Sequence, residues 1–163
     1  MYRVWQPRLF RYLARFLDDP AAAEELCDDV LLEVWKSAGK FRQDSKVSTW
    51  IFGIAHHKAV SHLRKARVDT EAIDEMRPFA DTGPGPERLL LEPAGRTAIH
   101  DALQRLTPAH REIIWLTFFE DMSYREIAHV AGCPESTVKT RVSYAKRSLH
   151  QLLAGENQGG SGL

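Results

Sequence analysis

Hydroxyl and basic side chains gather near the C-terminal end of the chain, in a pattern that suits nucleic-acid binding. No acidic residue occurs between Ser136 and Gly155. Hydroxyl groups can pair with base edges, and Arg and Lys can bind phosphates and guanine. A solvated surface helix would normally mix both signs of charge. The outward positions in this segment are Ser136, Thr137, Lys139, Thr140, Arg141, Ser143, Tyr144, Lys146 and Arg147.

A second basic segment, residues 45–66, also lacks acidic residues and has aromatic residues among its basic ones. A helix of this kind can bind a single strand, because aromatic rings stack on bases and cations attract phosphates. The alternative is that Trp50 lies in the core and that the basic residues at the end of the helix offset its dipole. The side chains concerned are Lys46, Trp50, Phe52, His56, His57, Lys58, His62, Arg64 and Lys65.

The segment 18–35 has the opposite charge. It carries seven acidic residues, and no Lys or Arg occurs before Lys36. Helical spacing places Glu25, Asp28 and Asp29 on one outer face. Such a face can bind a basic partner, or it can be a solvated surface with acids favourably placed near a helix N-terminus.

The sequence argues against metal binding and catalysis. Its two cysteines, Cys27 and Cys133, form no disulfide framework, and the histidines lack the close Cys/His pairs of a zinc site. No glycine-rich phosphate loop, nucleophile elbow or HExxH motif is present. We therefore expect no enzyme activity, no metal and no cofactor. No apolar run is long enough for a membrane span and no secretory leader follows Met1, so we expect a cytoplasmic protein.

The apolar periodicity that must position these groups is helical throughout. In the first part, a stripe of residues at three- and four-residue spacing runs from Ala23 to Ala38 and includes Val34 and Trp35. Asp19 and Pro20 predict its start, and Ser48 can cap a third helix over about residues 49–67. No alternating strand pattern of useful length appears, so the fold class is all-α.

The second part predicts four more helices. Thr107 and Pro108 begin one whose buried stripe is Ile113, Leu116 and Phe119. Residues 123–126 match a capping box, and Gly132 makes the turn into the last helix, which starts at Pro134. Two helices joined through such a turn are typical of a helix-turn-helix, although a plain helical hairpin has the same pattern.

Charge and proline content divide the chain. Residues 71–95 carry six acidic against two basic residues and four of the eight prolines, which predicts a flexible acidic linker. We therefore expect small helical domains at 1–70 and 96–154, with a flexible tail at 155–163. The formal net charge of zero is a cancellation between these segments, so it does not argue against nucleic-acid binding.

The chain resembles a known family at five places. Residues 19–35 (DPAAAEELCDDVLLEVW) and 47–55 (VSTWIFGIA) look like region 2 of the extracytoplasmic-function (ECF) sigma factors of bacterial RNA polymerase. Residues 106–114 (LTPAHREII), 122–128 (MSYREIA) and 136–141 (STVKTR) look like their region 4. The resemblance spans roughly residues 2–152, and the two regions occur in the family's order.

This resemblance implies a promoter-specific transcription initiation factor with core RNA polymerase, promoter DNA and an anti-sigma factor as partners. Its core-polymerase-binding residues would be Glu25, Asp28 and Asp29. The −10 element would be opened and held by Lys46, Ser48, Trp50, His56, His57 and Arg64. The −35 element would be read by Ser136, Thr137, Lys139, Thr140, Arg141 and Tyr144.

One departure from the family pattern lies in the segment expected to face the −10 element. The chain reads FGIAHH at residues 52–57 where the family usually has FRIARN, so His56 and His57 replace an Arg and an Asn. A histidine pair makes the charge of this surface sensitive to pH. The alternative function is a dimeric helix-turn-helix regulator that binds a palindrome without polymerase.

Overall fold

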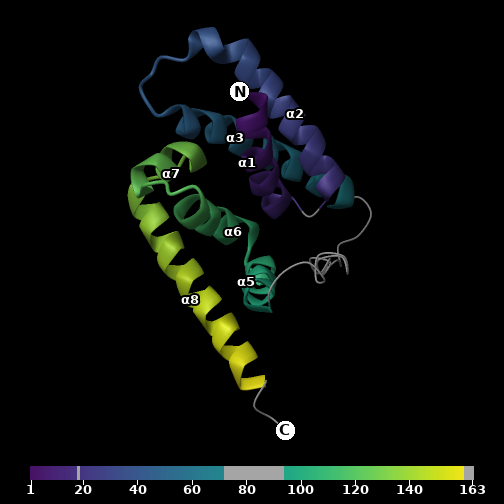
Figure 1. Cartoon of the computed structure of the whole chain (residues 1–163), viewed down its shortest axis with the longest axis vertical. Helices are drawn as coiled ribbons and strands as arrows, with labels where there is room; N and C mark the ends of the chain where they lie inside the picture. Colours follow the sequence, from purple (N-terminus) through teal and green to yellow (C-terminus); the bar gives the residue numbers. More distant parts are fainter. Residues whose placement is uncertain (18, 72–93, 160–163) are drawn as a thin grey trace.

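The computed structural model describes residues 1–17, 19–71 and 94–159, and every regular element within them is helical, which confirms the predicted all-α fold. The N-terminal half contains α1 (Tyr2–Phe16), α2 (Pro20–Ser37), a 3₁₀ turn η1 (Ala38–Lys40) and α3 (Val47–Glu71). The C-terminal half contains α5 (Ala94–Arg105), α6 (Pro108–Ile114), the π-helical turn η2 (Trp115–Phe119), α7 (Tyr124–Ala131) and α8 (Glu135–Gly159). Figure 1 shows their arrangement.

Local capping signals begin three helices at the predicted residues. The predicted cap at Ser48 was wrong, because α3 begins at Val47 and Ser48 lies inside its first turn. The Asp19 carboxylate accepts a hydrogen bond from the Ala21 amide at 3.0 Å, and the Thr107 hydroxyl accepts one from the amide of His110. Both bonds of the Ser123–Glu126 capping box are present. These caps satisfy backbone donors that have no partner inside the helix.

Several helix ends differ from the prediction. The third helix begins at Val47 and continues to Glu71, so it is longer at both ends than the predicted span of 49–67. The last helix continues to Gly159, beyond the predicted start of the tail at residue 155. Most of the predicted linker, residues 72–93, lies outside the described residues, as do residues 160–163 of the predicted tail.

The N-terminal half is a three-helix unit in which α1 packs against both α2 and α3. Leu9 and Leu13 of α1 are fully buried, together with Cys27 of α2 and Ala55 of α3. The small Ala side chains on the inner face of α3 allow the helices to approach closely, and the polar faces of α2 and α3 remain at the surface.

A π-helical turn changes the register after α6. The Glu120 amide bonds to the Trp115 carbonyl, five residues earlier, and the Thr117 hydroxyl bonds to the carbonyl of Ile113. The wider turn buries Trp115 and Leu116 and leaves Phe119 54% exposed. The prediction that Phe119 continues the buried stripe was therefore wrong, because the stripe assumed a constant 3.6-residue period.

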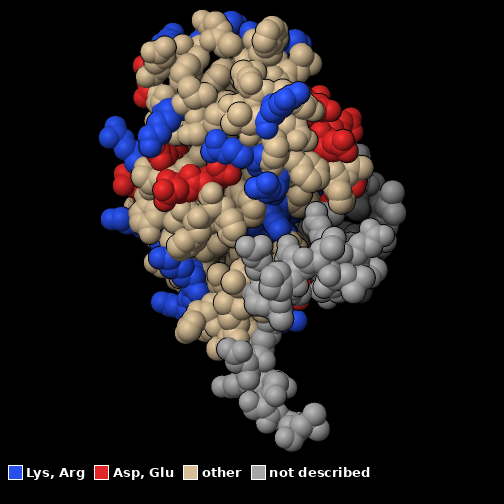
Figure 2. Space-filling view, in the orientation of Figure 1, with Lys and Arg blue, Asp and Glu red and all other residues tan. Residues whose placement is uncertain are grey.

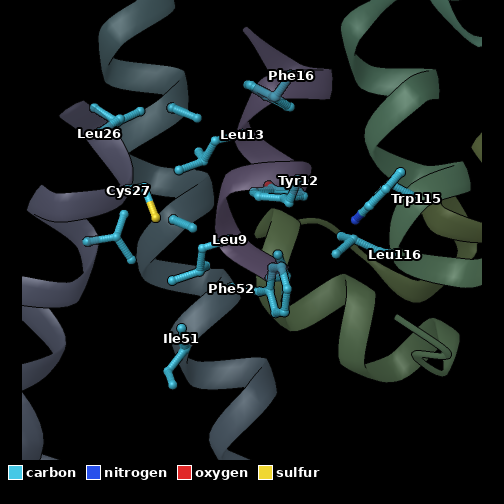
Figure 3. Close-up of a cluster of buried hydrophobic side chains, with 14 of the residues drawn as sticks. Leu9, Tyr12, Leu13, Phe16, Leu26, Cys27, Ile51, Phe52, Trp115 and Leu116 are labelled. Carbon is cyan, nitrogen blue, oxygen red and sulfur yellow. The ribbon is translucent and has the colours of Figure 1, made fainter. Parts of the chain in front are cut away.

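The two halves are packed together. Helix α7 lies against α3, and α6 lies against α1. One cluster of buried side chains includes residues of both halves, and Figure 3 shows Leu9, Tyr12 and Phe52 on one side with Trp115 and Leu116 on the other. The described residues therefore form one docked body. Among the described helices, none combines the length and hydropathy that crossing a bilayer requires.

Candidate nucleic-acid and protein interfaces

The predicted acidic surface is present on α2. Glu25, Asp28 and Asp29 are all exposed, and Figure 2 shows acidic side chains gathered over this helix at the right of the view. Among the described residues, no salt bridge joins any of these three carboxylates to a basic side chain. We call Glu25, Asp28 and Asp29 the acidic face.

Two apolar side chains extend the acidic face and were missed by the sequence reasoning. Leu32 is 52% exposed and Trp35 is 74% exposed, and both follow Asp28 at helical spacing on the same side of α2. The prediction placed Trp35 in the core stripe, because it adjoins Val34 in a helix whose apolar residues recur at helical spacing with almost no interruption. An exposed Trp beside exposed carboxylates is typical of a protein interface.

On α3, three of the candidate −10 residues share an outer face. Trp50, His57 and Arg64 are spaced by seven residues, almost two helical turns, so they lie in a row along the helix. Trp50 is half-buried and its ring lies against that of Phe41, with centroids 4.8 Å apart and the planes tilted by 30°, whereas His57 and Arg64 are exposed. We call this row the α3 ridge.

The remaining three −10 candidates lie elsewhere. His56 is turned toward the C-terminal half, where its Nδ1 lies 2.5 Å from a Glu112 carboxylate oxygen. Lys46, just before α3, forms a 2.9 Å ion pair with Glu126. This contact raises the pKa of the Lys46 ammonium and lowers the pKa of the Glu126 carboxyl. Ser48 is half-buried. The structure thus gathers three of the six residues on one face and engages two others in contacts between the halves.

A cleft between α2 and α3 brings the acidic face and the α3 ridge together. It has a volume of about 370 Å³, and both Asp29 and His57 line it. Lys58, His62 and Lys65 contribute to the same cleft, so its α3 side is basic. Among the residues that the structure describes, no group of three or more His, Cys, Asp or Glu side chains could hold a metal ion.

The predicted helix-turn-helix consists of α7, Gly132 and α8. Gly132 has a φ of +65°, the left-handed conformation that favours glycine, and this turn sets the direction of α8. Val138 and Val142 are buried against the C-terminal half, which leaves the opposite side of α8 at the surface.

The candidate −35 residues occupy that outer side. Ser136, Lys139, Thr140 and Tyr144 are exposed, and Thr137 and Arg141 are half-buried. The Arg141 guanidinium lies 3.9 Å from the Cys133 sulfur, so the turn restrains its orientation. The Thr140 hydroxyl donates to the Ser136 carbonyl, which leaves its lone pairs available to an outside donor. Helix α7 lies between these residues and α3, since it packs on both α3 and α8.

Two family models match the chain, in the order of the two halves. The Sigma-70 region 2 model matches residues 1–68, and the Sigma-70, region 4 model matches residues 96–149. The first match includes the acidic face and the α3 ridge, and the second includes the helix-turn-helix. The alternative of a dimeric regulator finds no support in these matches, because such a regulator would not need region 2.

Curated relatives align over most of the chain. The RNA polymerase sigma-H factor of Pseudomonas aeruginosa is 27% identical over 158 residues, which cover 91% of this chain and 82% of that protein. The ECF RNA polymerase sigma factor RpoE of Cereibacter sphaeroides is 29% identical over 155 residues, which cover 94% of this chain and 84% of the relative.

Solved structures have the same fold. The sigma factor RpoE from Bartonella quintana, in complex with the anti-sigma factor NepR, matches with a TM-score of 0.78 at 25% identity, covering 94% of each chain. CnrH in complex with the cytosolic domain of CnrY matches with a TM-score of 0.66 at 24% identity, covering 94% of this chain and 85% of CnrH, which shows the shared fold. With both sigma-70 regions matched in order along one chain, and with ECF sigma factors among its relatives, the chain belongs to the sigma-70 family as an ECF sigma factor.

Proposed function

We propose that this sigma factor binds core RNA polymerase through the acidic face of α2. Three exposed carboxylates on one side of a helix attract a basic partner surface, and they steer its approach over about a Debye length. Leu32 and Trp35 add apolar area beside the charge. Charge then selects the partner, and burial of the Trp35 ring supplies much of the affinity.

We further propose that the α3 ridge holds the non-template strand of the −10 element. Trp50 offers a ring for base stacking, while Arg64 and the protonated form of His57 offer positive charge to phosphates. Lys46 joins this surface once Glu126 no longer binds it. Ser48 and His56 are less accessible, so their part in strand binding is secondary.

Helix α8 is our proposed reader of the −35 element in duplex DNA. Exposed Ser136 and Thr140 lie near the N-terminal end of the helix, where recognition helices contact base edges. Lys139 suits phosphate contact, and Arg141 is held near the turn by Cys133. Thr137 and Tyr144 complete the predicted surface.

The same division of surfaces supports a role as a non-catalytic specificity subunit in the cytoplasm, with core polymerase performing the chemistry and no cofactor needed. The similar sigma factor RpoE from Bartonella quintana was solved in complex with an anti-sigma factor, NepR. We propose that an anti-sigma factor also controls this chain.

The observation that carries the proposal is the placement of the acidic face and the two DNA-facing surfaces on different helices of one chain. Run-off transcription with purified core polymerase, followed by start-site mapping and footprinting, tests it. We expect transcription only when both proteins are present, with protection at separated −35 and −10 elements. A footprint over a palindrome without polymerase would instead establish the dimeric regulator.

A further inference from the structure

The cleft between α2 and α3 contains side chains that neither the acidic face nor the α3 ridge includes. Only Asp29 belongs to the acidic face, and only His57 belongs to the ridge. The volume of the cleft is about 370 Å³, which is within the range of ligand pockets. Its described lining consists of Leu26 and Asp29 from α2, with His57, Lys58, Ser61, His62 and Lys65 from α3.

The α3 residues of the cleft lie on one side of the helix. Lys58 and His62 are four residues apart, and so are His57 and Ser61, so each pair lies one turn apart on the same face. The row ends at Lys65, eight residues after His57, and it therefore spans about 12 Å at ~1.5 Å per residue. Lys58 and His62 are half-buried, whereas Lys65 is exposed.

These side chains form a set of hydrogen-bond donors that suits phosphate. Lysine ammonium groups and the Ser61 hydroxyl donate, and a protonated imidazole donates from both ring nitrogens. A phosphate offers negative charge and several acceptor oxygens, so it can bind donors from more than one side chain. Among the described residues, no carboxylate forms a salt bridge with Lys58 or Lys65. Their charges are therefore available to a ligand.

The phosphodiester backbone of the strand proposed for the α3 ridge fits this row. The ridge and the cleft share His57, so a strand whose bases stack on Trp50 has its phosphates beside the same helix. Phosphates of one strand follow one another at ~3.4 Å along a duplex axis, so successive phosphates can use the whole row. A small free anion would use only part of it.

Asp29 opposes a phosphate in this cleft. It is the one acid among the described lining residues, and it comes from the α2 wall, opposite the basic row. Its charge repels a phosphate there, and solvent weakens this repulsion without abolishing it. Asp28 lies outside the cleft. Its charge raises the pKa of the Tyr2 phenol of α1, to which it is also hydrogen-bonded.

We propose that the α2–α3 cleft binds phosphates of the non-template strand, and that Asp29 couples this site to the polymerase-binding acidic face. The identities of strand and polymerase rest on the proposed function, whereas the phosphate site is a property of the free chain. A basic partner surface that covers Asp29 offsets its repulsion, so the cleft then binds phosphate more tightly. Coupling between two sites is reciprocal, so a bound strand strengthens polymerase binding by the same factor.

Proton binding contributes to the same site. Histidine side chains gain positive charge between pH 8 and pH 6, and His57 and His62 both line the cleft. Helices α1 and α7 also pack on α3, but none of their described residues lines the cleft. Phosphate binding should therefore strengthen as pH falls. The charged and titratable groups around the two imidazoles are Asp29, Lys58, Lys65 and His56, whose ring lies 6.4 Å from that of His57 and which pairs with Glu112.

A short oligothymidine with a fluorescein label tests the phosphate site on the free, full-length chain. It carries phosphates without a promoter sequence, and fluorescence anisotropy at low salt measures its dissociation constant. D29N removes the repelling charge from the cleft. D28N is the matched control, because it removes the same charge from the neighbouring residue, which lies outside the cleft.

We expect D29N to bind the oligothymidine about two- to fivefold more tightly than the wild type, as one unit charge at short range in solvent predicts. D28N should change the affinity less than twofold, and all three proteins should bind more tightly at pH 6 than at pH 8. Misfolding would not produce tighter binding. Equal effects of D28N and D29N, or no effect of D29N, would overturn the role of Asp29.

The double variant K58Q/H62Q tests whether the cleft is the place of binding. K36Q/H110Q is its control, because it removes one lysine and one histidine outside the cleft, and circular dichroism checks that both proteins fold. K58Q/H62Q should weaken binding at least about threefold, and D29N added to it should give no further gain. The full gain from D29N in this background would place the phosphate elsewhere.

Inorganic phosphate tests the other source of the same chemistry. We expect it to displace the oligothymidine no better than chloride does at equal ionic strength, because a single anion uses only part of the row. Strong displacement by phosphate alone would overturn the strand as the occupant of the cleft.

Core polymerase tests the coupling. Its affinity for the wild type should rise about two- to fivefold when the oligothymidine is saturating, and this gain should be absent in K58Q/H62Q. An equal gain in both proteins would overturn the coupling through the cleft. If polymerase binds none of these proteins, the proposed function fails, while the titration of the free chain still decides the phosphate site.

Discussion

The Tyr12 hydroxyl donates a 2.5 Å hydrogen bond to Glu112, one hundred residues further along the chain. Both side chains are buried, and the bond joins α1 of region 2 to α6 of region 4. Burial and the adjacent carboxylate charge raise the pKa of Tyr12 well above its usual value, so the hydroxyl keeps its proton at neutral pH. The two sigma regions are thus connected through a polar contact within an otherwise apolar cluster.

Replacing Tyr12 with Phe should lower the free energy of unfolding by about 1–3 kcal/mol, because it leaves the buried Glu112 carboxylate with one donor fewer. Urea denaturation followed by circular dichroism measures this difference. Tyr144→Phe is the control, since Tyr144 is 55% exposed. Equal stability of Y12F and the wild type would show that the contact contributes nothing net.

The Lys46–Glu126 pair predicts a dependence of stability on acid pH. The Lys46 ammonium, together with the Ser123 amide, holds the pKa of Glu126 below its ordinary value of 4.5. A lowered folded-state pKa contributes stability that is fully present above pH 4.5 and is lost as pH falls through the folded pKa. The stability difference between the wild type and E126Q should therefore be largest near neutral pH and shrink below about pH 4.5.

Urea denaturation at several pH values measures that difference, with E135Q as a control at an exposed position of α8. A difference that stays constant between pH 7 and pH 3.5 would contradict an ionic origin for the contribution of Glu126.

The two cysteines should react at very different rates. Cys27 is fully buried, and burial, with the charges of Asp28 and Glu24 adding to it, raises its pKa to about 11. Only about one Cys27 thiol in a thousand is ionised at pH 8, whereas Cys133, at the turn before α8, is only partly buried. A thiol-disulfide reagent should modify Cys133 rapidly and Cys27 slowly, with both fast in urea. C133S should therefore lose the fast phase of modification. A fast phase that persists in folded C133S would show that Cys27 is accessible at the surface.

Charge reversal on the acidic face should abolish binding to core polymerase. D28K with D29K replaces two exposed carboxylates by ammonium groups, which repel the basic partner surface that the carboxylates attract. We therefore expect at least a tenfold loss of affinity for core polymerase. Co-purification and fluorescence titration with core polymerase measure it. Circular dichroism should remain unchanged, and E135K on α8 provides a reversal away from this surface. Unchanged association of D28K/D29K would remove the acidic face from the interface.

Arg141→Ala should weaken promoter binding by the polymerase–sigma complex by about 1–3 kcal/mol if the guanidinium reads a base. Binding measured on the native −35 sequence and on single-base variants distinguishes the two kinds of contact. Loss of preference at one position identifies base reading, and an equal loss on all sequences identifies a phosphate contact. Lys139→Ala is the comparison at an exposed position, where we expect the uniform loss. An R141A protein that binds like the wild type would exclude both roles.

Features that depend on neighbouring residues were predictable from the sequence. The caps at Asp19 and Ser123 are local, because each hydrogen-bond partner lies within three residues of the cap. The turn at Gly132 is local too, because it depends on the backbone torsion angles of that one residue. The same holds for the spacing that places Asp28 and Asp29 together on α2. Helical periodicity, caps and segmental charge therefore determined the all-α fold, the helix-turn-helix and the charged faces.

Only the tertiary structure decided which of those residues remain accessible. His56 was predicted to face DNA, yet it pairs with Glu112, and Trp35 was placed in the core, yet it is 74% exposed. Both outcomes depend on which helix covers which face, and that choice is made by side chains far apart in sequence. The docking of the two halves is of the same kind, because the energy of contacts such as Tyr12–Glu112 has no local signature in either segment.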